Sequence, residues 1–323
     1  MITAEIKDKE LTEHLDSIYK DEMIVFVMAD GRIRGALFNG TRFVNQMRAQ
    51  HNLGILETMV LGQGCLCGAL LIPMMKGREK IAWKYEVDGP AKGFSVEADS
   101  AGSVRGFLLT DHIPVEKPLD NWDLSPFLGD GTMTFTSKQQ GDKTPFTSTV
   151  DIHNKNIALD LAYYFAQSEQ VQTAFNTNIQ MDKQGRVVGA GGLFLQVMPE
   201  TGGTKKVGSQ VGSSADWKDD EELLSKVEMD FKTAPMLGKW FRDGHKTDEL
   251  ILSLFKEFKP VVPVHRTIKF ECPCSEESYI NYIRTLPKDE LNDIKKNGPD
   301  PLEVTCRNCG SVYHIPVSKI FVE

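Results

Sequence analysis

The chain has 323 residues, of which 41% are hydrophobic and 25% charged, and its formal net charge is −8. These are ordinary globular proportions, and the length predicts about two or three domains. The acidic balance argues against a nucleic-acid partner, because phosphate backbones are bound by clustered Lys and Arg, and no such run is present.

The start of the chain has no targeting signal that we can identify. Residues 1–22 are polar and mixed in charge, without the apolar segment of a signal peptide. The longest apolar-rich run, about 65–75, is shorter than the ~20 residues that span a bilayer, and Pro73 interrupts it. Six cysteines are too few for a disulfide scaffold in a chain of this length. We therefore expect a cytoplasmic protein with no membrane partner and with thiols available for metal or redox chemistry.

Strand and helix patterns interleave over the first 200 residues. Strands are expected where β-branched and aromatic residues gather between turn signals, at 23–28, 80–87, 94–98, 131–136 and 193–197. Helix-like spacing of apolar residues predicts helices at 41–50, 55–75 and 157–175. A strand meander packed with helices, rather than strict βαβ alternation, favours an α+β fold with an N-terminal mixed sheet-and-helix domain.

A composition break follows Pro199. Residues 200–216 are rich in Gly, Ser and Lys, which predicts a flexible segment. Two amphipathic helices are then expected, one over about 218–231 and one that starts near Thr247 and stops before Pro260. The second carries one apolar stripe, here called the linker apolar face, formed by Leu250, Ile251, Leu254, Phe255 and Phe258. The predicted units are an α+β core domain at 1–200, a flexible segment plus helical linker at 201–264, and a small terminal domain at 265–323.

Four cysteines of the terminal domain form two closely spaced pairs. The first is Cys272-Pro-Cys274, and the second is Cys306-Arg-Asn-Cys309, followed by Gly310. Tetrahedral zinc prefers four such soft ligands, and the second pair has the spacing of a knuckle turn that directs both sulfurs inward. The sequence therefore predicts one zinc ion here, with a metal-free pair of dithiols as the alternative. Zinc binding worth on the order of 10–16 kcal/mol would supply much of the folding energy of so small a domain.

A static zinc module of an RNA- or ribosome-associated protein is the main functional alternative. Residues 266–323 contain eight Lys and Arg against nine Asp and Glu, so the domain offers no basic face. Zinc-bound thiolates are also the form that peroxide and hypochlorite attack, which favours a redox switch. A thiol oxidoreductase is a third class, but it would usually place its Cys-x-x-Cys at a helix start in a thioredoxin-like fold. No nucleophile–base motif is present, so we do not expect an enzyme and assign no catalytic residue.

Two further sets of residues are weaker candidates. Cys65 and Cys67 lie in a predicted helix, where residues two apart point about 200° away from each other and cannot share a metal. We expect them to be buried apolar residues, with an accessory thiol sensor as the alternative. His265 and His314 flank the four cysteines but are surplus as ligands, because four thiolates already complete the tetrahedron.

Several motifs together resemble the redox-regulated 33-kDa heat-shock chaperone family. The terminal motif is Phe270-Glu-Cys-Pro-Cys-Ser-Glu, followed some thirty residues later by Cys-x-x-Cys-Gly. Upstream, four segments are similar to motifs of the family. Residues 34–35 match its Arg-Gly and residues 88–90 its Asp-Gly-Pro. Residues 164–170 match its Tyr-Phe-x-x-Ser-Glu-Gln, and residues 191–199 its Gly-Gly-x-x-x-Gln-x-Met-Pro. The likeness covers nearly the whole chain in the same order. The insertion at 201–215 and the thiols at 65 and 67 depart from the family pattern.

The resemblance implies an ATP-independent holdase that is inactive when it is reduced and zinc-bound. In the family, oxidation pairs neighbouring cysteines, which here are Cys272 with Cys274 and Cys306 with Cys309. Zinc leaves, the terminal domain unfolds and the linker loosens. Unfolded or partly folded client proteins then bind newly exposed apolar surface, and active forms are commonly homodimers. The linker apolar face fits this scheme, because such a stripe must be covered while the switch is off and could be uncovered when the neighbouring domain unfolds.

Overall fold

Two sheets form the framework of the protein. The computed structural model describes residues 1–115, 121–198 and 220–321. The five-stranded sheet has the order β10-β1-β2-β9-β8, with strands at Val261–Arg266, Glu22–Met28, Ile33–Asn39, Val187–Val197 and Thr173–Met181. The six-stranded sheet has the order β11-β5-β4-β3-β6-β7, with strands at Lys269–Phe270, Ser103–Leu108, Gly93–Asp99, Lys80–Val87, Gly131–Lys138 and Phe146–Asp151. Helices accompany both sheets, which confirms the predicted α+β class.

Helix α3 (Ile55–Leu71) fills the space between the two sheets. Nearly all of its residues are buried, and it packs on β4 and β5 of one sheet and on β8 and β9 of the other. Its glycines allow this close approach, since a Cβ on Gly64 would lie 2.7 Å from the Phe94 ring. The segment Ile55–Met74 has a mean hydropathy of 1.8, and in length and composition it could cross a membrane. Because 89% of that apolar window is buried inside the protein, the segment is a core helix.

Cys65 and Cys67 lie in this buried helix, as expected. Both thiols are fully buried. Burial raises the pKa of Cys67 to about 12 and raises the pKa of Cys65 further, so both remain protonated at neutral pH. An oxidant reacts with thiolates rather than thiols, and these two are therefore poor sensors.

The predicted strands are present as β1, β3, β4, β6 and β9, but the helix predicted over 157–175 is wrong in its second half. Helix α5 (Ile157–Tyr164) passes into a π turn at Phe165–Glu169, and Gln170 adopts a left-handed conformation with φ of 55°. Strand β8 begins at Thr173, where β-branched and aromatic residues pair with β9.

The remaining N-terminal helices and 3-10 turns are α1 (Lys9–Ser17), α2 (Thr41–His51), α4 (Ser125–Leu128) and the turn at Ile72–Met74.

Three linker helices cover the outer face of the five-stranded sheet. They are α6 (Asp220–Lys232), α7 (Leu237–Arg242) and α8 (Thr247–Leu254), followed by a 3-10 turn at Lys256–Phe258. Four residues of the linker apolar face are buried and Leu254 is half-buried. They pack on apolar residues of β1, β2 and β9, and the Phe255 ring stacks on Phe26 at 6.1 Å between centroids. The flexible segment predicted at 200–216 lies outside the described residues.

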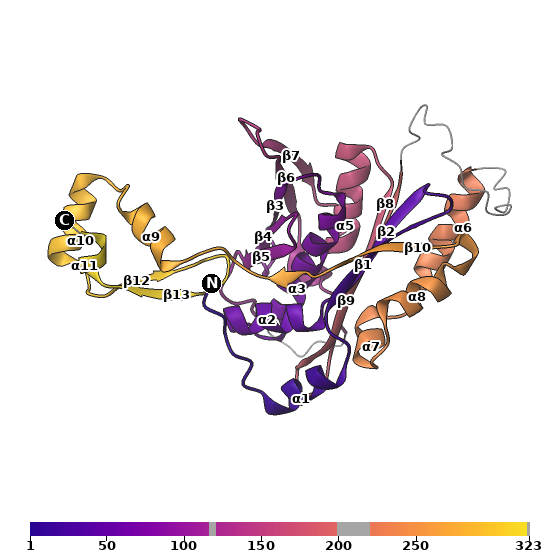
Figure 1. Cartoon of the computed structure of the whole chain (residues 1–323), viewed down its shortest axis with the longest axis horizontal. Helices are drawn as coiled ribbons and strands as arrows, with labels where there is room; N and C mark the ends of the chain where they lie inside the picture. Colours follow the sequence, from indigo (N-terminus) through magenta and orange to yellow (C-terminus); the bar gives the residue numbers. More distant parts are fainter. Residues whose placement is uncertain (116–120, 199–219, 322–323) are drawn as a thin grey trace.

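The terminal domain lies at the opposite end of the molecule from the linker helices (Figure 1). It consists of α9 (Glu276–Ile283), α10 (Lys288–Asn297), the hairpin β12 (Leu302–Thr305) and β13 (Val312–Ile315), and α11 (Val317–Ile320). Its own apolar cluster has only four buried members among the described residues, Ile283, Tyr313, Ile315 and Ile320. So small a core agrees with a domain that depends on additional bonds for its stability.

The expectation that the linker apolar face lies beside the cysteine site is wrong. Among the described residues, the cluster that buries this face contains none beyond Val262, so the face is covered by the sheet and not by the terminal domain. The two ends are joined by β10, which pairs antiparallel with β1, and by β11, which pairs parallel with β5 (Figure 1). The boundary predicted at residue 265 lies inside β10. Strands β10 and β11 are therefore the direct chain connection between the linker helices and the cysteine site.

Candidate metal centre

The four cysteines of the terminal domain come together in space. The sulfurs of Cys272, Cys274, Cys306 and Cys309 all lie within 4.8 Å of one another. The Cys272 and Cys306 sulfurs are 3.8 Å apart, and the Cys274 and Cys309 sulfurs are 3.4 Å apart. A tetrahedral site with Zn–S bonds of about 2.3 Å would separate its sulfurs by about 3.8 Å. The donor set and its spacing therefore suit a tetrahedral, thiolate-bound metal ion.

Two backbone segments place these sulfurs. Cys272 follows β11, and the amide of the intervening Glu271 donates to the Val104 carbonyl of β5 at 2.9 Å. Cys306 and Cys309 lie on the turn between β12 and β13, where the Gly310 amide donates to the Cys306 carbonyl at 2.7 Å. Gly310 has φ of 67°, a conformation that favours glycine, and this is what allows the knuckle to close.

Hydrogen bonds among the crowded thiols shift the pKa values of Cys272 and Cys306 in opposite directions. Hydrogen bonds from the Cys272 and Cys309 thiols lower the pKa of Cys306 far below its usual value. The hydrogen bond to Cys306 is also the main reason that the pKa of Cys272 is raised. Without a metal ion, these hydrogen bonds thus favour a thiolate on Cys306 beside a protonated Cys272, whereas a bound dication would favour thiolates among its ligands.

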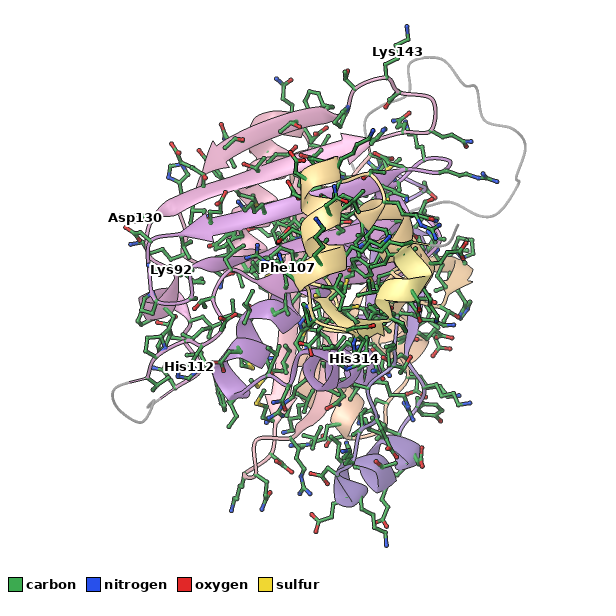
Figure 2. The ribbon with its side chains drawn as sticks, turned by 90° about the vertical axis from the view of Figure 1, so that its left-hand side faces the viewer. Lys92, Phe107, His112, Asp130, Lys143 and His314 are labelled. Atoms are coloured by element: carbon green, nitrogen blue, oxygen red, sulfur yellow. The ribbon has the colours of Figure 1, made fainter. Side chains whose placement is uncertain are left out.

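The cysteine cluster is packed against the core domain as well as against its own domain. Cys272, Cys306 and Cys309 are buried in the same apolar cluster as the core residues of α3, while Cys274 is half-buried. The Gly106 amide of β5 donates to the Asn308 carbonyl at 3.2 Å, and the Arg307 guanidinium lies 4.4 Å from the centre of the Phe107 ring. Figure 2 views the molecule from this end, with the terminal domain in front of the six-stranded sheet.

Both histidines near the cluster lie outside it, as predicted. His265 on β10 pairs with Glu22 at 3.1 Å, and His314 on β13 lies 3.9 Å from Glu303. Both side chains are more than half exposed. Figure 2 labels His314 on the terminal domain.

Other residues support the cysteines but carry no sequence pattern that could have identified them. The Tyr313 hydroxyl lies 3.2 Å from the Cys274 sulfur and donates to the Cys274 carbonyl at 2.9 Å. The Ser311 hydroxyl lies 3.2 Å from the Cys309 sulfur. Single polar residues of this kind become visible only when the fold brings them to the sulfurs.

Comparisons with known proteins agree over nearly the whole chain. The profile of the family described as Hsp33 protein matches residues 21–316. A 33 kDa chaperonin of Geobacter sp. (strain M21) is 28% identical over 293 residues, which are 91% of this chain and 93% of the relative. The 33 kDa chaperonin of Thermotoga maritima is 30% identical over 289 residues, or 88% of this chain and 91% of that one. A crystal structure of the 33 kDa chaperonin (heat shock protein 33 homolog) from Thermotoga maritima has a TM-score of 0.77 at 28% identity and covers 94% of this chain and 97% of its own.

Proposed function

The chain belongs to the Hsp33 protein family, whose members are named chaperonins, and on that premise we propose that it is a redox-regulated holdase of the cytoplasm. In this proposal the reduced, zinc-bound protein is inactive, and oxidation of the four cysteines turns it on. The observation that carries the proposal is a four-sulfur cluster built where the terminal domain meets the core.

Oxidation would convert the cysteines from metal-binding thiolates into disulfides that cannot bind zinc. Zinc bound at the cluster would tie the two cysteine turns together through four thiolates. The family resemblance implies that Cys306 pairs with Cys309 and Cys272 with Cys274, and all four sulfurs lie within 4.8 Å of one another. When two thiolates form a disulfide they give up two electrons, and peroxide accepts these electrons together with two protons from solvent as it is reduced to two water molecules. The paired sulfurs are no longer thiolates, and the domain is left with its small apolar cluster.

Loss of the terminal domain would then loosen the segment that follows the linker helices. Strand β11 contributes only two residues to its sheet, and β10 carries an irregular register against β1 at Val25 and Val27. If both strands detach, the chain that follows α8 is no longer paired with the two sheets, and α6 to α8 are held less firmly on the five-stranded sheet. The apolar residues exposed would include Phe26 and Leu193 of the sheet and the linker apolar face. Unfolded or partly folded client proteins would bind this surface, and a second oxidised copy could pair through it as a homodimer.

The decisive experiment measures zinc release and suppression of client aggregation in the same samples, with and without peroxide. A colorimetric chelator reports zinc, and light scattering of a heat-denatured client reports aggregation. We expect the reduced protein to retain its zinc and to leave client aggregation unchanged. After oxidation it should release zinc and suppress aggregation. If the reduced, zinc-loaded protein suppresses client aggregation as well as the oxidised protein does, there is no redox switch. Salt-sensitive binding to RNA would instead favour the alternative function, a static zinc module of an RNA-associated protein.

A further inference from the structure

The last turn of α2 reaches the cysteine knuckle through Gln50. This polar side chain is only 8% exposed, and each end of its amide is hydrogen-bonded. Its Nε2 group donates to the Ile2 carbonyl at 2.6 Å and to the Ser311 hydroxyl at 3.2 Å, while its Oε1 atom accepts from the Ala4 amide at 2.9 Å. The Gln50 carbonyl also lies so close to Gly310 that a Cβ there would come within 2.4 Å of it. Gln50 therefore contacts the knuckle with both its side chain and its backbone.

The hydrogen bonds to Ser311 determine where its hydroxyl proton can point. Ser311 is 3% exposed, and its Oγ atom accepts from the Gln50 amide and from the Ile2 backbone amide at 3.0 Å. Oγ also accepts from the Cys309 thiol and donates to the Ile2 carbonyl, each at 3.2 Å. When Cys309 is a thiolate it has no proton to donate. The two amides then occupy both lone pairs of Oγ, and the serine proton has two acceptors within reach, the Cys309 sulfur and the Ile2 carbonyl. An ionised sulfur is the stronger acceptor, so the proton is directed at Cys309 whenever that residue is a thiolate.

We propose that Gln50 is a positioning residue for the cysteine cluster. It holds the Ser311 hydroxyl so that its proton is donated to the Cys309 thiolate, and it thereby ties the end of α2 to the state of the cluster. This inference rests on the proposed function, because it assumes that the four cysteines act as metal-binding thiolates. A hydrogen bond of this kind orients a ligand and withdraws charge from its sulfur, so it should strengthen metal binding and slow attack on Cys309.

The test compares Gln50→Met with Gln46→Met in the full-length protein. Methionine keeps the length and helix preference of glutamine but removes both hydrogen-bonding groups. Gln46 lies one turn earlier on α2 and is a matched control, because it donates to the Ala4 carbonyl at 3.1 Å and to Gln50, but not to Ser311. Competition with a chelator should show zinc affinity about tenfold weaker for Gln50→Met, the effect expected for a residue that helps to orient a metal ligand, and nearly unchanged for Gln46→Met. Equal affinities for the two variants would overturn the inference.

A double-variant cycle shows whether Gln50 acts through Ser311. Ser311→Ala removes the last donor without altering α2, and it also provides a test if Gln50→Met folds poorly. If the two residues act in series, zinc affinity of Gln50→Met with Ser311→Ala should equal that of Ser311→Ala alone. Losses that simply add would show independent effects and contradict the relay. Zinc affinity unchanged by Ser311→Ala would contradict it as well.

A readout without metal or client separates this inference from the proposed function. The reduced, zinc-free proteins are treated with iodoacetamide at alkaline pH, and alkylation of Cys309 is followed by mass spectrometry. Alkaline pH is needed because the relay and the reaction both require the Cys309 thiolate. The hydrogen bond to Cys272 lowers the pKa of Cys309, but the hydrogen bond to Cys306 and burial together outweigh it and raise that pKa. We expect Cys309 to react several-fold faster in Gln50→Met than in Gln46→Met, since a hydroxyl no longer shields its sulfur. Equal alkylation rates would count against the relay even if the protein proves to be a chaperone. Failure to protect clients, with faster alkylation retained, would instead remove the chaperone switch and leave the relay in place.

Discussion

At the scale of single residues, Cys306 is the cysteine whose loss should matter most. Its pKa is the one held low by its neighbours, and its backbone closes the knuckle through Gly310. Cys306→Ser replaces a soft thiolate by a hydroxyl that zinc binds poorly. Loss of a residue that only hydrogen-bonds a metal ligand weakens binding by roughly 10–100-fold, and we expect zinc affinity to fall by more than this. The resting protein should also shift toward an unfolded terminal domain. Zinc stoichiometry and amide exchange over 272–321 measure both effects.

The matched control for this variant is Cys67→Ala. It also removes one buried thiol, but from α3 and not from the cluster. It should lower the free energy of unfolding through lost packing while leaving one zinc ion per chain. A full zinc complement in Cys306→Ser would remove Cys306 from the ligand set.

At the scale of elements, the packing of α8 should help to keep the outer face of the five-stranded sheet covered in the reduced protein. Phe255 is fully buried against Phe26, and Leu254 lies half-buried beside it. Leu254→Asp with Phe255→Asp removes this packing, which for one Phe→Ala change is worth about 3–5 kcal/mol, and adds carboxylates that favour water. We expect α6 to α8 to detach in the reduced protein, which would then suppress client aggregation without oxidant.

A charge on the solvent side of the same helix provides the control. Leu252 is 50% exposed on α8, so Leu252→Asp should leave the reduced protein inactive. If the double variant is also inactive when reduced, the linker apolar face does not hold the switch closed.

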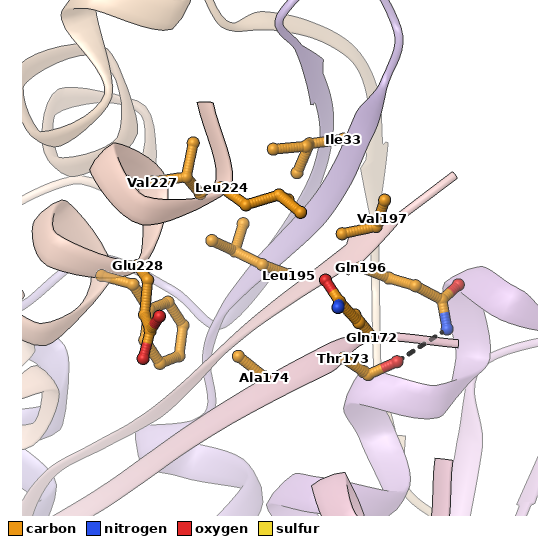
Figure 3. Close-up of a pocket in the computed structure, with 11 residues that line it drawn as sticks. Ile33, Gln172, Thr173, Ala174, Leu195, Gln196, Val197, Leu224, Val227 and Glu228 are labelled. Atoms are coloured by element: carbon orange, nitrogen blue, oxygen red, sulfur yellow. Dashed lines mark hydrogen bonds between the residues drawn. The ribbon is translucent and has the colours of Figure 1, made fainter. Parts of the chain in front are cut away.

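Helix α6 is packed less tightly than α8. A cavity of about 250 Å³ lies beneath it, bounded by Leu224 and Val227 of α6 and by Ala174 and Leu195 of the sheet (Figure 3). Ala174→Leu would fill part of this space and add apolar contact, so we expect α6 to exchange its amide protons more slowly and activation by peroxide to be delayed. Ala174→Ser changes the side-chain volume little and should leave both rates near those of the parent protein. Faster exchange in Ala174→Leu would show that the cavity is too narrow for the added carbons.

At the scale of the whole molecule, the sequence predicted local patterns better than distant contacts. The four cysteines were identifiable because paired thiols at short spacing are a local signal, and the buried helix containing Cys65 was identifiable from its apolar content. Strand β10 was not, because Pro260 and Pro263 mark only the end of a helix and give no sign that the chain returns to β1. The contact between Gln50 and Ser311 joins residues 261 positions apart. Such contacts follow from topology, and no spacing in one sequence encodes them.

That topology gives the last prediction, which concerns the order in which the molecule should open. The cysteine cluster and the linker helices lie at opposite ends, and the chain connects them directly through β10 and β11. When a chelator removes zinc under reducing conditions, amide protection should be lost first over 272–321, next over 261–270 and last in α6 to α8. Helix α3, buried between the sheets, should stay protected throughout. Hydrogen exchange followed over time by mass spectrometry resolves these segments. Loss of protection in α6 to α8 while β10 remains paired would show that the two ends are coupled by another route.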